Sequence, residues 1–89
     1  MKAIITVIGK DNVGILAQVS QACANADVNI MEVTQSVLQD MFAMVMLVEI
    51  DKASISFEEL RKNLDEVGKK TATKIHLMHE DIFNSMHKI

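Results

Sequence analysis

The chain has 89 residues, a net charge of −3 and 49% hydrophobic residues, so we expect one compact domain over residues 1–89. Its Lys and Arg residues are scattered, which argues against nucleic acid as a partner. The single Cys23 excludes an intramolecular disulfide and a multi-cysteine metal site, and no apolar run suits a signal peptide or a membrane span. We therefore expect a soluble, cytoplasmic protein with no membrane partner.

The first strand and helix are joined by a glycine-containing segment. Residues 3–8 are β-branched and almost wholly apolar, which predicts a strand buried on both faces. Apolar residues at helical spacing then predict an amphipathic helix over roughly 14–25. A sharp turn from the strand through Gly9–Leu16 would leave backbone N–H groups free at the helix N-terminus, which suits a small anion. We expect Asp11 or Asn12 to cap this helix.

The next two strands form a predicted hairpin. Residues 28–37 have mixed polar and apolar faces, which is typical of a partly buried strand. Gln39 and Asp40 then mark a turn into a third strand over 41–50.

The last three elements follow from local signals. Ser56 and Glu59 form a capping box, which predicts the start of a second helix. Gly68 is expected near the end of that helix, where a left-handed residue is common. Alternation over 71–78 predicts a fourth strand, and 80–87 is expected to form a short tail helix.

This order predicts an α+β fold of the ferredoxin-like βαββαβ type: a four-stranded antiparallel sheet with two helices on one face, plus a short C-terminal helix. The third strand, however, is apolar on both of its faces. Its alternating sets are Phe42, Met44, Met46 and Val48 on one face, and Met41, Ala43, Val45 and Leu47 on the other. We expect the tail helix to cover part of the second sheet face and a second subunit to cover the rest, which predicts a homodimer.

With this plan, several segments resemble the ACT domain, a regulatory module that commonly binds amino acids. The matching residues are Ile4–Ile8, Gly9–Leu16, Val28–Ile30 and Gln35. The likeness covers nearly the whole chain and is strongest to the ACT units of the glycine-cleavage repressor and of formyltetrahydrofolate deformylase. It implies a small-molecule partner, an amino acid or a related metabolite, and no cofactor.

The resemblance also implies a set of ligand-binding residues. In members of the serine and aspartate pathways an Asn usually occupies the place of Asp11; the acidic residue here favours a ligand's ammonium over its carboxylate. Asn29 matches a position that in some members binds ligand across the dimer interface. Gly14 is open to two interpretations, a close approach of the ligand or only the demands of the turn. The expected set is Asp11, Asn12, Val13, Gly14, Ile15, Leu16, Asn29 and Ile30.

No catalytic or metal-binding residue is predicted. Cys23 has no base near it in sequence, and the spacing of His76, His79 and His87 does not complete a metal-ligand set. Arg61 is predicted on the second helix, far from the first loop where a phosphate-cleaving enzyme of this plan would need it. We therefore expect no enzyme. The alternative to ligand binding is a ligand-free interaction module that docks on an unidentified protein through its sheet face or edge.

Overall fold

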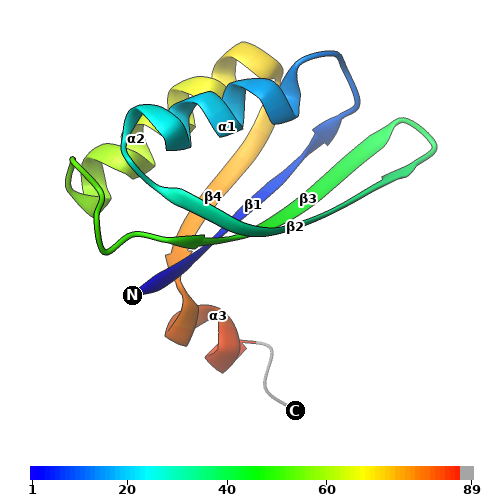
Figure 1. Ribbon diagram of the computed structural model, residues 1–89. Helices are drawn as coiled ribbons and strands as arrows, with labels where there is room; N and C mark the ends of the chain where they lie inside the picture. Colours follow the sequence, from blue (N-terminus) through cyan, green and yellow to red (C-terminus); the bar gives the residue numbers. More distant parts are fainter. Residues whose placement is uncertain (87–89) are drawn as a thin grey trace.

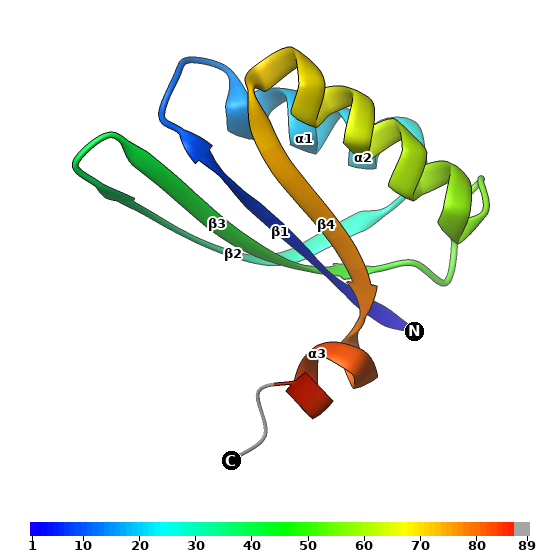
Figure 2. The same ribbon diagram turned by 180° about the vertical axis from the view of Figure 1, so that it is seen from behind.

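The computed structural model describes residues 1–86, and its element order confirms the predicted βαββαβ plan with a tail helix (Figure 1). All strand pairs are antiparallel, and the strand order β2-β3-β1-β4 makes β2 and β4 the edge strands. Helices α1 and α2 cover one face of the sheet, while α3 lies on the opposite side (Figures 1 and 2). The elements are β1 (Lys2–Lys10), α1 (Ile15–Asn25), β2 (Asn29–Leu38), β3 (Met41–Glu49), α2 (Phe57–Thr71), β4 (Thr73–His79) and α3 (Glu80–Met86).

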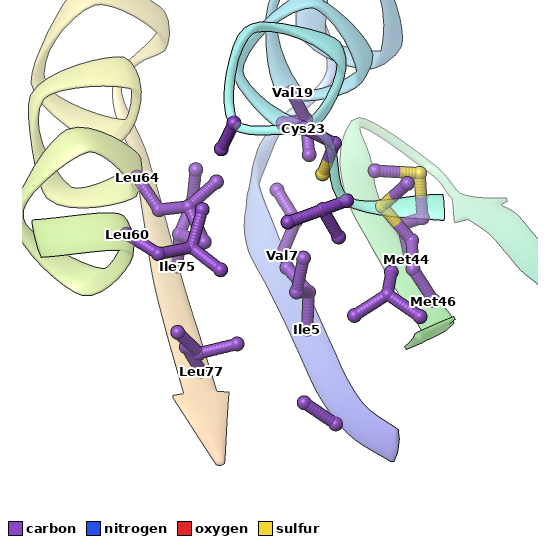
Figure 3. Close-up of a cluster of buried hydrophobic side chains, with 14 of the residues drawn as sticks. Ile5, Val7, Val19, Cys23, Met44, Met46, Leu60, Leu64, Ile75 and Leu77 are labelled. Carbon is purple, nitrogen blue, oxygen red and sulfur yellow. The ribbon is translucent and has the colours of Figure 1, made fainter. Parts of the chain in front are cut away.

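The hydrophobic core lies between the sheet and the pair α1 and α2 (Figure 3). Alternate side chains of each strand point into it, as the period of two requires. Among the residues that Figure 3 labels, α1 contributes Val19 and Cys23, and α2 contributes Leu60 and Leu64. The strands contribute Ile5, Val7, Met44, Met46, Ile75 and Leu77.

Cys23 is fully buried in this core, and burial raises the pKa of its thiol to about 11. We therefore expect the native protein at pH 8 to react with a thiol reagent at least about 100-fold more slowly than the denatured chain, because the raised pKa alone removes that much thiolate. The folded protein holds the thiol proton more tightly than the unfolded chain does. The contribution of Cys23 to the free energy of unfolding is therefore complete below about pH 9 and is lost as the pH rises towards 11. Reaction rates with and without denaturant measure the first effect; equal rates would contradict it.

Helix α2 begins as predicted and ends differently. The hydroxyl of Ser56 accepts a hydrogen bond from the N–H of Glu59 at 3.1 Å, which confirms the cap. The left-handed residue at the other end is Ala72, with φ 57°, so the expectation for Gly68 is wrong. Gly68 instead lies inside α2, where a Cβ atom would stand 2.8 Å from the carbonyl oxygen of Thr73. This glycine allows α2 to approach β4 closely.

Within residues 1–86, the face of the sheet away from α1 and α2, here called the open face, is covered at one end only. Helix α3 contacts β1 and β4 there. Ile4 and Ile8 both point to this face from β1, yet Ile4 is 6% exposed and Ile8 is 50% exposed. The tail helix thus covers part of the open face, as expected. Within residues 1–86, no helix is long and apolar enough to cross a membrane.

Candidate functional site

The predicted ligand loop connects the end of β1 to the start of α1. Gly14 precedes the helix as its N-cap with φ 92° and ψ 2°, a left-handed conformation that glycine adopts without strain. Among the described residues no side chain caps α1, so the expected cap by Asp11 or Asn12 is wrong. The turn alone therefore explains the glycine, because any other L-residue would be strained there even in open space.

Asn12 is instead a bridge between the loop and the end of α2. Its Nδ2 atom donates hydrogen bonds to the carbonyl oxygens of Lys10 at 3.1 Å and Thr71 at 2.9 Å. The N–H of Asp11 donates to the carbonyl oxygen of Asp40 at 2.7 Å, which ties the loop to the β2–β3 hairpin. The loop is thus held at both sides, while the Asp11 side chain remains exposed.

The loop presents several unused backbone donors. Within residues 1–86, the N–H groups of Asn12, Val13 and Gly14 have no hydrogen-bond acceptor. The N–H groups of the first helical turn also lack intrahelical partners, and the positive end of the helix dipole lies here. Val13 is 98% exposed and Leu16 is 40% exposed. The loop therefore combines free amides for an anion with an apolar rim and one acidic side chain.

Asn29 lies at the other end of the sheet. It pairs with Glu49, which also pairs with Lys2 at the start of β1. The distance along β1 from Lys2 to Lys10 is roughly 26 Å at about 3.3 Å per residue, so one chain does not bring Asn29 to the loop. Ile30 beside it is partly buried against the core. Sequence reasoning thus selected two groups of residues that a single subunit keeps apart.

One hollow includes Asn29, and a second lies before the loop but is lined by none of the predicted ligand-binding residues. The one beside Asn29 has a volume of about 460 Å³ and is lined by three carboxylates, Asp27, Glu49 and Asp51, together with Lys52. These acidic neighbours were missed because they come from separate turns and strands. A hydrogen bond from the N-terminal ammonium is the main cause that lowers the pKa of Asp51. The hollow before the loop measures about 320 Å³ and is lined by Ile8, Gly9, Lys10, Asp40 and Met41.

The histidines have other surroundings. His79 stacks on Phe57 with ring centroids 4.3 Å apart, which places it in packing at the start of α2. His76 is exposed on β4, and His87 lies outside the described residues. In the part of the chain from residue 1 to 86, no three His, Cys, Asp or Glu side chains are grouped so as to hold a metal ion.

The model of the ACT domain family matches residues 2–78, which spans β1 to β4 and includes both groups of predicted site residues. This chain belongs to the ACT domain family. The ACT domain is a regulatory module that binds small ligands. A UPF0237 protein from Clostridium acetobutylicum is 46% identical over 89 residues, which is 100% of both chains.

Solved structures agree with this assignment. An ACT domain protein from Streptococcus pneumoniae is 39% identical, covers 98% of both chains and superposes with a TM-score of 0.81. A formyltetrahydrofolate deformylase from Pseudomonas syringae pv. tomato is 18% identical, with a TM-score of 0.79 over 88% of this chain and 27% of that one. A candidate glycine cleavage system transcriptional repressor is 20% identical, with a TM-score of 0.74 over 85% of this chain and 43% of that one. The last two likenesses show the shared fold, and both proteins are of the kinds that the sequence resembles.

Proposed function

We propose that this ACT domain binds an amino acid or a related metabolite and acts as a regulatory homodimer. The ligand contacts are the loop from Asp11 to Leu16 in one subunit and the pair Asn29 and Ile30 in the other. The observation that carries the proposal is the set of free backbone amides at the Gly14 turn. In this role no residue of the chain is catalytic, and the protein acts in the cytoplasm.

The chemistry of the loop favours a ligand that carries both a carboxylate and an ammonium group. Backbone amides at a helix N-terminus stabilise a carboxylate, because they donate hydrogen bonds and the helix dipole is positive there. The exposed carboxylate of Asp11 stabilises an ammonium beside it. An α-amino acid carries these two groups on one carbon atom, so it fits the loop better than a simple anion.

Strand β2 supplies the geometry for a shared site. It is an edge strand, and all of its residues except Ile30 are exposed. If two copies pair β2 with β2 about a twofold axis, the strands run antiparallel. The start of β2 in one copy then lies beside the end of β2 in the other copy. The ligand loop lies at this same end of the sheet. This pairing would bring Asn29 of the partner subunit to the loop, a contact that one chain cannot make.

Apolar side chains beside that edge support the same pairing. Val33 and Val37 pair with the core residues Met46 and Phe42, so they point to the helix side of the sheet. They are nevertheless 42% and 50% exposed, so the helix side of the sheet leaves them partly open to water. Leu16 on α1 is 40% exposed. A second copy would remove these three side chains from water and so stabilise the edge contact.

A thermal-shift experiment with the standard amino acids tests the proposal. A ligand that binds only the native state at 100 times its dissociation constant adds about 2.7 kcal/mol, which should raise the melting temperature by several degrees. The matched variant is Asp11→Asn, which should shift the preference towards ligands whose carboxylate is their main charge. If no amino acid or related metabolite raises the midpoint, ligand binding is wrong and the ligand-free interaction module takes its place.

A further inference from the structure

The open face of the sheet has a bare end opposite the end that α3 covers. The bare end consists of Ile8, Leu38, Met41 and Val45, which point to this face and are 50%, 77%, 49% and 40% exposed. Register places them side by side, since Met41 pairs with Leu38 across one strand boundary and Ile8 pairs with Ala43, between Met41 and Val45, across the next. They form a continuous apolar area that nothing in residues 1–86 covers.

Helix α3 carries a second unburied apolar surface. The ACT family model ends at residue 78, so α3 is an addition to the matched domain. Phe83 is partly buried, whereas Ile82 and Met86 are 52% and 65% exposed. The latter two are four residues apart and therefore lie on one face of the helix. A short helix that buries none of its residues and presents two large apolar side chains to water is suited to an interface.

The charges at the two ends of the open face are complementary. Glu80 and Asp81 form the acidic first turn of α3. At the bare end, Lys74 pairs with Ile8 and Lys10 pairs with Met41, so both lysines lie on the open face. Among the described residues, none of these four charged groups forms an ion pair within 4 Å. These four groups are therefore available to pair with another copy, although each end also holds a charge of the opposite sign: Lys2 beside Glu80 and Asp81, and Asp40 beside Lys10.

We propose that a second copy of this chain docks on the open face, with each α3 lying on the bare end of the other copy. The twofold axis lies between the two sheets and runs perpendicular to the strands. This operation places β4 over β4 in opposite directions, so α3, which follows β4 directly, reaches the end of the partner that carries the lysines. Because α3 contacts β1 and β4, it then lies over β1 and β4 of the other copy, where Ile82 and Met86 cover Ile8 and where Glu80 and Asp81 approach the lysines. The rest of the apolar area, on β2 and β3, faces the same strands of the other copy.

The size of the face is sufficient for a stable contact. Four strands at about 4.8 Å and about nine residues at about 3.3 Å give a sheet face of roughly 550 Å² per copy, of which α3 already covers one end. The outer surface of α3 takes the place of the covered part, so two copies together bury on the order of 1,000 Å², the lower bound for a specific interface. This surface is separate from the β2 edge and from the ligand loop. If both contacts form and their twofold axes intersect at right angles, the assembly is a closed tetramer.

Sedimentation velocity of the full chain over a range of concentrations tests this contact. The double variant Ile82→Glu/Met86→Glu should raise the dissociation constant by about 100-fold or more, because two large apolar side chains are lost from the interface and charges are buried there. The fold should survive, since neither side chain is buried within its own chain. The matched control Asn84→Glu/Ser85→Glu adds the same charge to exposed positions of the same helix and should change the constant by less than about threefold.

A charge exchange gives a second measurement. Lys74→Glu should weaken the association, and Lys74→Glu combined with Asp81→Lys should restore it in part, which a defect in folding would not allow. A monomeric wild-type chain, or an assembly that Ile82→Glu/Met86→Glu leaves intact, overturns the proposal. Val37→Lys tests the β2 edge separately. If that variant has no effect while the α3 variant produces monomers, the open-face contact holds and the edge pairing of the proposed function fails.

Discussion

Replacing Gly9 by alanine is expected to lower the free energy of unfolding by about 3 kcal/mol, because the added atom meets the backbone of Ala72 and Thr73 as well as the Thr73 side chain. A Cβ atom on Gly9 would lie 2.8 Å from the carbonyl oxygen of Ala72 and 2.9 Å from the Cα atom of Thr73. Relief requires β1 and β4 to separate where they pair. Chemical denaturation of the purified variant measures the loss.

Two other glycines serve as controls for this result. Gly14→Ala should cost only about 1 kcal/mol, from the strain at φ 92°, because the nearest atom to its Cβ is Gln18 Nε2 at 3.7 Å. Gly68→Ala adds about 1 kcal/mol of helix propensity but directs a Cβ to 2.8 Å from the Thr73 carbonyl, so we expect a net loss. If Gly14→Ala proves more harmful than Gly9→Ala, the explanation by close backbone contact is wrong.

Replacing Asn29 by alanine is expected to weaken ligand binding by about tenfold and to remove the effect of ligand on dimerisation. Asn29 is exposed and stands at the start of β2, so the fold should persist. The reason for the large effect is that a ligand bound to the loop of one subunit and to Asn29 of the partner subunit stabilises both contacts together. Calorimetric titration of the amino acid found by thermal shift measures the affinity.

Thermodynamic linkage requires a reciprocal effect that can also be measured. If ligand tightens the dimer, dilution to monomers must weaken ligand binding by the same factor. Titrations at two protein concentrations, one on each side of the dimer dissociation constant, measure that factor. Asn63→Ala, an exposed asparagine on α2, is the matched control and should leave affinity unchanged. Equal affinity at both concentrations would place the whole site within one subunit and contradict the shared site.

The helices and strands were predicted well from the sequence because the signals for them involve residues that are close together in the chain. The cap by Ser56 depends on Glu59 three positions later, and the turn at Gln39 depends on neighbours within the hairpin. The predictions were wrong where the local conformation depends on a residue that is distant in the sequence. Asn12 does not cap α1 because its amide reaches the carbonyl of Thr71, 59 positions away. Gly68 is not a helix end because β4 approaches it, and this contact exists only after the chain has folded.

The sequence predicted where the candidate loop lies in the chain, but it did not predict how the site residues are arranged in space. Its loop follows from a strand that ends near Gly9 and a helix that begins near Ile15. The separation of Asn29 from that loop depends on the sheet, because β1 and β2 both pair antiparallel with β3 and therefore start at the same end. The carboxylates beside Asn29 come from other segments. The spacing of these carboxylates along the chain does not indicate that they lie together beside Asn29.

The unequal edges of the sheet limit how far it can grow. Helix α2 lies along β4, where Arg61 donates a hydrogen bond to the carbonyl of Leu77 at 3.2 Å and Gly68 stands against Thr73. Arg61 thus occupies one backbone acceptor of β4, whereas no side chain among the described residues does so on β2. A sheet with two bare edges can polymerise without end into a fibre. Because the Arg61 side chain obstructs a further strand at β4, we expect pairing through β2 to stop after two chains and to give a finite assembly.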